Sequence, residues 1–348
     1  MFRITEGRYN NHRPHERNTM PKIVRFHETG AADVLKLEDV PLAEPGKGEV
    51  RLKVEAFGLN RAEVMFRQGV YLEEAVFPSR LGYEAAGIVD AVGPEVGGIQ
   101  VGDRVSTIPS FSIGKYGVYG ESAIVPAYAT AGYPDTLSAV EGAAIWMQYM
   151  TAFGALVEYG RVKKGDIVLI TAASSSVGLA AIQIAKSCGA VAVAATRGDR
   201  KKESLLEAGA DHVIVTDKED VAARMKDITG GKGAAIIFDP VAGPLLEKLA
   251  DAAAQGAVIF QYGALSAAPT PFPLSQAIGK GLSVRGYTLF EISSDPAKMA
   301  RGKNFIYDGL SSGALKPIIA RTFPLEEIVE AHRFMESNQQ IGKIVVTV

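Results

Sequence analysis

The most informative hydrophobic pattern in the chain lies between residues 165 and 186. Ile167 to Ile170 form a short, continuous apolar run of mostly β-branched residues, which predicts a fully buried strand. Small residues follow, and after Gly178 the apolar positions recur at helical spacing. The pattern predicts a strand, a tight turn and a helix that starts at the turn.

The predicted turn has the properties of a phosphate-binding site. The first N–H groups of a helix lack intrahelical partners, and the helix dipole favours an anion there. The sequence departs from the G-x-G-x-x-G pattern, because its three glycine positions hold Ala173, Ser175 and Gly178. The turn alone leaves two readings open: a dinucleotide site, or an ordinary turn of a doubly wound sheet.

Three consecutive serines make this turn unusual. Their hydroxyl groups can donate to a pyrophosphate in place of bare N–H contacts. Alternatively, Ser175 holds the backbone further from the phosphates and weakens binding. The residues that we assign to the pyrophosphate are Ser174, Ser175, Ser176, Val177 and Gly178.

The rest of the chain shows two kinds of secondary-structure pattern. Residues 20–130 contain short strands separated by glycines, such as the period-2 alternation of 49–55, and predict a barrel-like β domain. From about residue 140, helices alternate with apolar strands, which predicts a parallel sheet covered on both faces. Short-strand texture returns in the tail. We therefore expect an α/β chain in which 20–142 and 289–348 form one domain and 143–288 form an inserted, doubly wound domain.

Individual elements follow from the same periodicities. The expected helices are 61–68, 141–159, 178–188, 201–208, 219–228, 243–254, 295–312 and 325–336. The expected strands are 22–26, 35–40, 49–55, 82–89, 101–105, 120–125, 167–170, 190–195, 212–215, 234–238, 256–260, 282–286, 317–321 and 344–348.

Composition excludes several classes of protein. The formal net charge of −2 does not indicate a nucleic-acid or anionic-membrane partner, and no apolar run is long enough to cross a bilayer. Cys188 is the one cysteine, so an internal disulfide is impossible and a cytoplasmic location is expected. Residues 1–19 are polar and lack periodicity, so we expect a disordered extension or a misplaced start before Met20.

An ordered set of short motifs resembles the medium-chain dehydrogenase/reductase superfamily, in its zinc-free quinone oxidoreductase (zeta-crystallin-like) branch. The motifs are Gly58–Glu63, Tyr71, Phe77-Pro78, Gly82–Gly87, Val101–Val105, Thr151–Phe153, the turn, Phe238-Asp239, Tyr262-Gly263 and Ile341–Lys343. The resemblance extends from about Met20 to Val348. It implies a GroES-like barrel domain interrupted by a Rossmann domain, an active site between them, and a homodimer formed through the strand near residues 282–286.

Zinc can be tested against the sequence. The zinc alcohol dehydrogenases of this superfamily use a Cys, a Gly-His-Glu and a later Cys, whereas this chain has Asn60 and Gly82-Tyr83-Glu84 at the first two places. No cysteine precedes Cys188, and Glu84 remains without a Cys or His beside it, so the three ligands that a catalytic zinc needs are not present together. Alcohol oxidation would lack an alkoxide stabiliser. The sequence favours reduction of a quinone or an α,β-unsaturated carbonyl.

The coenzyme is predicted from the end of the second strand of the inserted domain. NAD enzymes carry an acidic residue about 20 positions beyond the turn, where it binds the ribose 2′-hydroxyl. Here the place is taken by Thr196 and Arg197, followed by Arg200 and Lys201. Cations suit a 2′-phosphate, and the resemblance implies a lysine at the Lys201 position. We predict NADPH, with Asp199 capping the next helix; the alternative is a solvated charged face.

The resemblance also implies the residues at the nicotinamide end. They are Asn60, Gln148, Thr151, Tyr262, Gly263, Gly342 and Lys343. Asn60, Tyr71 and Thr151 are the catalytic candidates. Each has a purely structural alternative. Asn60 caps the helix from 61, the Thr151 hydroxyl bonds its own backbone, and Tyr71 is an aromatic side chain packed at the edge of the cleft. Tyr83, Trp146 and Tyr149 either contact a flat acceptor or belong to the core.

The predicted reaction is direct hydride transfer from NADPH to a quinone-type acceptor, with solvent as a possible proton source. A second reading is an NADPH-dependent 2-alkenal or enoyl reductase, in which Tyr71 matters more as a proton donor. A third is a nucleotide-binding protein without catalysis, supported only by Ser175 and Ser176.

Overall fold

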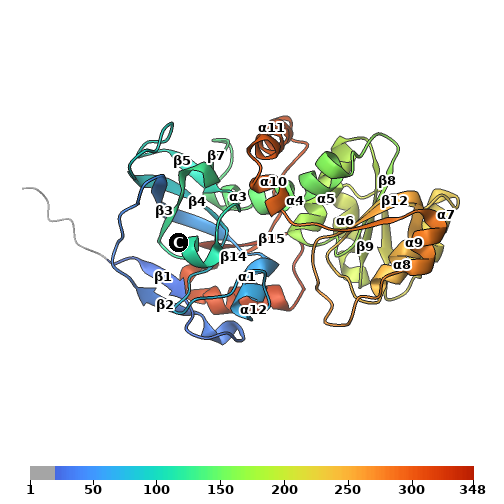
Figure 1. Ribbon diagram of the computed structural model, residues 1–348, viewed down its shortest axis with the longest axis horizontal. Helices are drawn as coiled ribbons and strands as arrows, with labels where there is room; N and C mark the ends of the chain where they lie inside the picture. Colours follow the sequence, from blue (N-terminus) through green and yellow to red (C-terminus); the bar gives the residue numbers. More distant parts are fainter. Residues whose placement is uncertain (1–19) are drawn as a thin grey trace, which may run out of the picture.

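Two large β-sheets organise residues 20–348, which are the part of the chain that the computed structural model describes. The sheets belong to two domains that lie side by side along the long axis of the molecule (Figure 1). The expectation for residues 1–19 lies outside the described residues.

The inserted domain contains a six-stranded parallel sheet. Its strands are β8 (Ile167–Ile170), β9 (Val191–Thr196), β10 (His212–Val215), β11 (Ala234–Asp239), β12 (Ala253–Gln261) and β13 (Ser283–Gly286). Their order across the sheet is β10-β9-β8-β11-β12-β13, and all neighbours run parallel. The order reverses between β8 and β11, which confirms the predicted doubly wound fold. In such sheets ligands bind beyond the carboxyl ends of the strands at this reversal.

Helices cover both faces of the parallel sheet. They are α5 (Ser176–Ser187), η4 (Asp199–Lys201), α6 (Lys202–Glu207), α7 (Val221–Thr229), α8 (Leu245–Ala252) and α9 (Leu274–Lys280). Residues of α5 and α6 share one apolar cluster with the sheet, whereas α7 and α8 pack into a separate cluster. In Figure 1, α5 lies on the side nearer the other domain and α7 to α9 lie on the far side.

The barrel-like domain contains a seven-stranded sheet. Its strands are β3 (Glu49–Gly58), β4 (Glu84–Val92), β5 (Arg104–Thr107), β6 (Ser122–Pro126), β7 (Thr130–Gly132), β14 (Ile319–Pro324) and β15 (Lys343–Thr347). The path is β14-β15-β3-β4-β5-β7, with β6 also paired to β3. Because β15 pairs with β3, the tail returns to the first domain, as the short-strand texture predicted.

Short elements complete this domain. They are β1 (Lys22–Arg25), η1 (Ala32–Val34), β2 (Lys36–Asp39), α1 (Arg61–Arg67), α2 (Ile113–Tyr116), η2 (Ala127–Ala129), α3 (Ala139–Gly142), η5 (Leu325–Glu327) and α12 (Ile328–Glu336). None of the helices within residues 20–348 combines the length and apolarity needed to span a bilayer.

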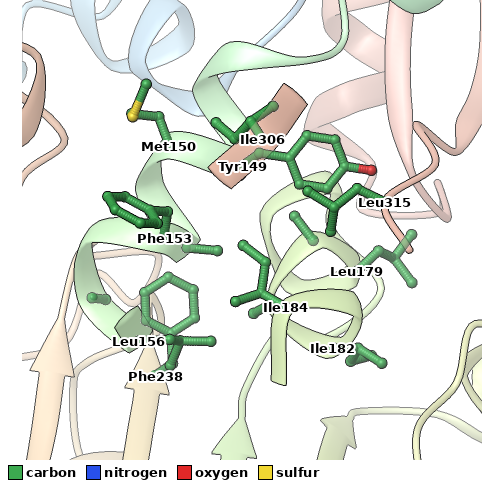
Figure 2. Packing of buried hydrophobic residues seen from close by; sticks show 14 of the residues in the cluster. Tyr149, Met150, Phe153, Leu156, Leu179, Ile182, Ile184, Phe238, Ile306 and Leu315 are labelled. Carbon is green, nitrogen blue, oxygen red and sulfur yellow. The ribbon is translucent and has the colours of Figure 1, made fainter. Parts of the chain in front are cut away.

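Helices also form the junction of the two domains. They are α4 (Trp146–Phe153), the π-helix η3 (Gly154–Tyr159), α10 (Phe290–Ser293) and α11 (Pro296–Ser312). Figure 2 shows Tyr149 and Phe153 of α4 packed in one apolar cluster with Leu179 and Ile184 of α5. Because α5 starts at the turn after β8, this packing also places α4 beside that turn.

Among the expected elements, the helix over 141–159 and the strand over 101–105 differ from the structure for reasons that the hydrogen bonds show. The single helix expected over 141–159 is divided into α3, α4 and η3. In η3 the N–H of Gly160 bonds the carbonyl of Ala155, five residues earlier, and apolar spacing does not distinguish this bonding from an α-helix. The strand expected over 101–105 starts at Arg104, because the Asp103 carboxylate accepts from the Gln100 N–H at 2.9 Å and closes a turn there.

Candidate active site at the junction of the two domains

The turn after β8 has the geometry of a phosphate-binding turn. Ser175 is the N-cap of α5, and its hydroxyl oxygen accepts from the Gly178 N–H at 3.0 Å. A Cβ on Gly178 would lie 2.6 Å from the carbonyl oxygen of Ala173, so only glycine permits this close packing of helix on strand. Residues 173 and 175 can therefore depart from glycine, whereas residue 178 cannot.

Two backbone donors of this turn are free. The N–H groups of Ser176 and Val177 are the first two of α5, and they have no acceptor among residues 20–348. They lie at the positive end of the helix dipole, where phosphate oxygens bind. The Gly178 N–H donates to the Ser175 hydroxyl oxygen, so this N–H is not free to donate to a phosphate. The turn fits a pyrophosphate.

Lys201 connects this turn to the end of the chain. Its Nζ donates to the Ser174 hydroxyl at 3.0 Å and to the carbonyl oxygens of Asn338 and Gln340 at 2.8 and 2.9 Å. Burial lowers the pKa of Lys201, and the charges of Arg197 and Arg200 lower it further. The predicted 2′-phosphate residues therefore lie together beside the turn, with the buried hydroxyl of Thr196 at the end of β9.

The prediction that Asp199 caps the next helix is wrong. Asp199 makes no capping bond at the start of α6, and its carboxylate pairs with the Lys218 ammonium. Lys218 lies 19 residues further along the chain, so the local sequence does not show that it binds the Asp199 carboxylate in place of the helix N–H groups. As a result the Asp199 carboxylate is engaged away from Lys201.

Four polar residues, Asn60, Glu63, Glu84 and Lys343, form what we call the buried polar cluster. The Lys343 ammonium pairs with the Glu84 carboxylate and donates to the Asn60 Oδ1 at 2.6 Å. The Asn60 Nδ2 donates to Glu63 at 3.2 Å and to Glu84 at 3.3 Å. Backbone N–H groups of Tyr83 and Met147 complete the shells of Glu63 and Glu84. Lys343 and Glu84 form an ion pair, and the Glu63 carboxyl accepts hydrogen bonds only from neutral N–H groups.

The fold places the members of this cluster separately. Asn60 precedes α1, and the Glu63 carboxylate accepts from its backbone N–H at 2.6 Å in a capping box. Glu84 starts β4 and Lys343 starts β15, and these strands flank β3 on its two sides. A Cβ on Gly58 of β3 would lie 2.6 Å from the Lys343 Cε. Glycine at 58 therefore makes room for the lysine side chain.

Exposure within the cluster corrects one prediction and refines another. The Lys343 side chain has 0% exposure, so the expected direct contact of Lys343 with a cofactor does not fit the structure. Asn60 retains 8% exposure, more than the other members. Asn60 caps α1 and also bonds Glu84 and Lys343, and its contact with a bound molecule stays a prediction.

Glu63 and Glu84 are the residues that sequence reasoning missed as site residues. The signal was present in part, because Asn60-x-x-Glu63 has the spacing of a capping box. Glu84 is a lone charge in the otherwise apolar and small-residue segment 82–87. Its interaction with Lys343 has no local signature.

Burial raises the pKa of the Glu63 carboxyl from its ordinary value of 4.5 to about 7. The Lys343 charge and the Asn60 hydrogen bond oppose this increase, and the Glu84 charge adds to it. The buried polar cluster therefore changes its net charge near neutral pH.

This carboxyl predicts a pH-dependent stability. Between its unfolded pKa and about 7 the folded state binds more protons than the unfolded state, so the free energy of unfolding falls as pH rises. The contribution lost across this window is about 3 kcal/mol. Glu63→Gln should flatten the dependence, because the amide does not titrate; urea unfolding across this pH window measures it. Glu74→Gln, at an exposed position, is the control and should keep the wild-type slope. An unchanged slope in Glu63→Gln would refute the assignment.

Tyr71 lies at the margin of the same region. The hydroxyl groups of Tyr71 and Tyr83 lie 3.4 Å apart, and the Tyr83 ring packs against Phe111 and Phe290. Burial raises the pKa of both phenols, so both stay protonated at neutral pH. Tyr71 is only partly buried, whereas Tyr83 is 1% exposed. Tyr71 is thus the accessible member of the pair.

Two of the other aromatic candidates belong to the core. Trp146 and Tyr149 have no exposed surface. The indole Nε1 of Trp146 donates to the Ser106 hydroxyl at 2.7 Å, and the Tyr149 hydroxyl donates to Gln183 at 2.8 Å. They support α4 and do not present a face to an acceptor.

Gln148 and Thr151 lie one turn apart on α4. Gln148 is 2% exposed, and its Oε1 has no partner among residues 20–348; it lines a small pocket together with Ser176. The Thr151 hydroxyl donates to its own helix at Met147 O, 2.5 Å away, which is the plainer alternative for this residue. The Gln148 Oε1 is therefore free to accept a hydrogen bond next to the turn. The Thr151 hydroxyl has already donated its proton to the helix, so it can only accept a further hydrogen bond.

Tyr262 and Gly263 follow β12 at the carboxyl edge of the parallel sheet. The Tyr262 ring stacks on Phe238 with centroids 3.9 Å apart, and its hydroxyl has no partner among residues 20–348. Gly342 lies across the junction, where its N–H donates to the Ser174 carbonyl at 3.0 Å. The turn, β12 and the segment before β15 therefore meet at one place.

Metal ligands do not gather in the described part of the chain. Residues 20–348 contain no group of three or more His, Cys, Asp or Glu side chains placed to hold a metal ion. Glu84, the one zinc-type residue at the predicted position, is engaged by Lys343, Asn60 and the Met147 N–H. A separate cavity of about 360 Å³ lies near α7, α8 and β12, far from the junction, and none of the predicted site residues lines it.

Comparisons with known proteins agree with this geometry. Residues 46–172 match the family described as "Alcohol dehydrogenase GroES-like domain", and residues 176–301 match "Zinc-binding dehydrogenase". Over 327 residues the chain is 31% identical to the 2-haloacrylate reductase of a Burkholderia species, covering 92% of this chain and 97% of that protein. The chain belongs to the medium-chain dehydrogenase/reductase superfamily. Within it, the relatives and structures point to the quinone oxidoreductase branch.

Members of this branch cover almost all of the chain. Human quinone oxidoreductase is 31% identical over 327 residues, which span 93% of this chain and 97% of that protein. The crystal structure of Escherichia coli quinone oxidoreductase complexed with NADPH is 30% identical, with a TM-score of 0.88. It covers 94% of this chain and 100% of the other. The GroES-like and Rossmann-like domains predicted from the sequence are therefore those of the superfamily.

Proposed function

We propose that the chain is an NADPH-dependent reductase of quinone-type acceptors that works without zinc. The observation that carries the proposal is the contact between Lys201 and Ser174, 3.0 Å long. It joins the cations suited to a 2′-phosphate to the turn whose free N–H groups suit a pyrophosphate. The similarity to quinone oxidoreductases, one of them described with NADPH, supports the same coenzyme and acceptor.

The coenzyme would be held along the junction. Ser176 and Val177 would donate N–H groups to the pyrophosphate, and Arg197 and Lys201 would pair with the 2′-phosphate. Asn60, Gln148, Thr151, Tyr262 and Gly263 would surround the nicotinamide end. The bound nicotinamide supplies a hydride. The protein's part is to orient the two reactants and exclude water.

Reduction of a quinone or an enone also needs a proton. We propose that the Tyr71 hydroxyl holds a proton near the acceptor, because its raised pKa keeps it protonated. A quinone becomes a stabilised phenolate-like anion, so solvent can also protonate it. An enone forms a more basic enolate and depends more on Tyr71.

The second candidate function is reduction of an activated carbon–carbon double bond. The protonated Tyr71 next to Tyr83 favours it, as does the similarity to a 2-haloacrylate reductase. Nucleotide binding without catalysis is the third candidate.

A panel of acceptors separates these functions. Chelator-treated protein is mixed with NADPH and phenanthrenequinone, 2-chloroacrylate or a crotonyl thioester, and NADPH oxidation is followed. Turnover of the quinone but of neither 2-chloroacrylate nor the thioester supports the proposal. Turnover of 2-chloroacrylate or the thioester but not of the quinone supports the second function. Binding of NADPH without turnover of any acceptor supports the third. Loss of activity after chelation, with recovery on adding zinc, would overturn the metal-free mechanism.

Ser175→Gly tests the role of the serine turn. The substitution removes the acceptor that occupies the Gly178 N–H and frees this group for a phosphate, while a glycine N-cap costs only a few tenths of a kcal/mol. We expect NADPH to bind roughly threefold more tightly. Calorimetric titration measures the dissociation constant, with Ser187→Gly at the far end of α5 as a control. Weaker binding would mean that the hydroxyl itself donates to the pyrophosphate.

The assembly, the location and the domain limits are also part of the proposal. β13 is an edge strand of the parallel sheet, and Phe272, Leu274 and Ile278, in and just before the α9 helix that precedes it in the chain, are exposed. These features support a homodimer formed through this edge.

The single cysteine supports a cytoplasmic location, and the net charge of −2 supports small-molecule rather than nucleic-acid partners. Residues 20–142 with 289–348, and 143–288, are the proposed domains.

A further inference from the structure

Arg61 brings a cation of the barrel-like domain to the coenzyme side of the junction. It is the first residue of α1, and its Nη2 donates to the Met335 carbonyl at 2.6 Å and to the Asn338 Oδ1 at 2.5 Å. Lys201 of the inserted domain donates to the backbone carbonyl of the same Asn338 at 2.8 Å. One residue therefore holds a cation from each domain.

The guanidinium of Arg61 has donors to spare. A guanidinium carries five N–H groups, and Nη2 supplies both bonds that anchor it. The Nε and Nη1 groups have no acceptor among residues 20–348 and are not buried orphans. Their fork geometry is the one that binds two oxygens of a phosphate.

The charges around Arg61 are arranged as in an anion site. Burial and the Arg197 charge lower the pKa of Arg61, and Arg197 also lowers that of Lys201. The acid that opposes this at Arg61 is Glu336, which pairs with the Arg67 guanidinium at 2.5 Å. Like charges repel one another, and an anion between Arg61 and Arg197 would relieve the repulsion.

We propose that Arg61 is a specificity-determining residue that binds the 2′-phosphate of NADPH from the barrel-like domain, opposite Arg197 and Lys201. The inference rests on the proposed function and deepens it. The 2′-phosphate would then link the two domains through Arg61 on one side and Arg197 on the other. NADH lacks this group and would leave Arg61 without a ligand.

Arg61→Gln tests the proposal by binding rather than by activity. Dissociation constants for NADPH, NADH and 2′,5′-ADP are measured by calorimetric titration of the full chain. We expect Arg61→Gln to weaken NADPH and 2′,5′-ADP by about tenfold and to change NADH by less than about twofold. Arg104→Gln is the matched control, because Arg104 donates to the Leu137 carbonyl at 2.8 Å elsewhere on the same domain. It should leave all three constants unchanged.

Arg197→Gln separates this inference from the proposed function. If Arg197→Gln weakens NADPH selectively and Arg61→Gln does not, the role of Arg61 is overturned and the coenzyme site stands. Equal weakening of NADPH and NADH in Arg61→Gln would show a purely structural role and also overturn it. If neither variant changes the preference, the proposed 2′-phosphate site itself is refuted. Arg61→Lys should fall between wild type and Arg61→Gln, because lysine keeps the charge but not the fork.

Discussion

Replacing Lys343 with methionine is expected to lower the free energy of unfolding by about 3–5 kcal/mol. Methionine preserves most of the apolar stem but removes the ammonium that pairs with Glu84 and donates to Asn60. Glu84 is 1% exposed and Glu63 is fully buried, so water cannot replace the lost charge. The loss therefore reflects an uncompensated buried carboxylate rather than a missing attraction.

A second substitution and a control make this prediction specific. Lys343→Met with Glu84→Gln should recover a large part of the loss, because the remaining amide is neutral. Lys280→Met is the control: its Nζ donates to the carbonyls of Ala250, Asp251 and Ala253 but pairs with no carboxylate. We expect it to cost about 1 kcal/mol. Urea unfolding of the four proteins decides the matter, and a Lys343→Met protein as stable as wild type would contradict the assigned pairing.

Arg197→Asp is expected to invert the coenzyme preference. In the wild type we expect NADPH to bind about tenfold or more tightly than NADH. An aspartate at the end of β9 would repel the 2′-phosphate and accept a hydrogen bond from the ribose 2′-hydroxyl of NADH. The ratio of the two dissociation constants should change by on the order of 100-fold, or about 2.7 kcal/mol. Arg197 is exposed, so the fold should tolerate the change.

The measurement is the pair of dissociation constants for each protein. Arg161→Asp, which places the same charge before the amino end of β8 and away from the turn, should leave the ratio unchanged. An unchanged ratio in Arg197→Asp would place the 2′-phosphate elsewhere. A similar change in both variants would indicate a long-range charge effect.

Local patterns predicted the parts of the site that depend on local structure. The run from Ile167 to Gly178 carries its own strand, turn and helix start, and the structure reproduces them within two residues. The basic residues after β9 were predicted to bind a 2′-phosphate because, in this fold, the residues after that strand lie at the ribose of the coenzyme. The short-strand pattern of the tail predicted its return to the first domain, and the pairing of β15 with β3 agrees with this.

Contacts between distant residues were beyond the sequence. Lys343 meets Glu84 and Asn60 across 259 and 283 residues, and one sequence contains no trace of this pairing. The resemblance implied Lys343 at the nicotinamide end, whereas its buried ammonium bonds Glu84 and Asn60. Arg61 lies beside Asn60 in the sequence, but its role depends on Asn338, 277 residues away. Tertiary structure decides both positions.

We propose that hydride passes directly from NADPH to a quinone without a metal. The most direct test is the single-turnover rate of NADPH oxidation by phenanthrenequinone on chelator-treated protein, measured with hydrogen or deuterium at the transferred position of the nicotinamide. We predict a protein-dependent rate that is slower with deuterium and unchanged by added zinc. A rate no faster than in buffer, or one that appears only when zinc is added, would contradict the claim.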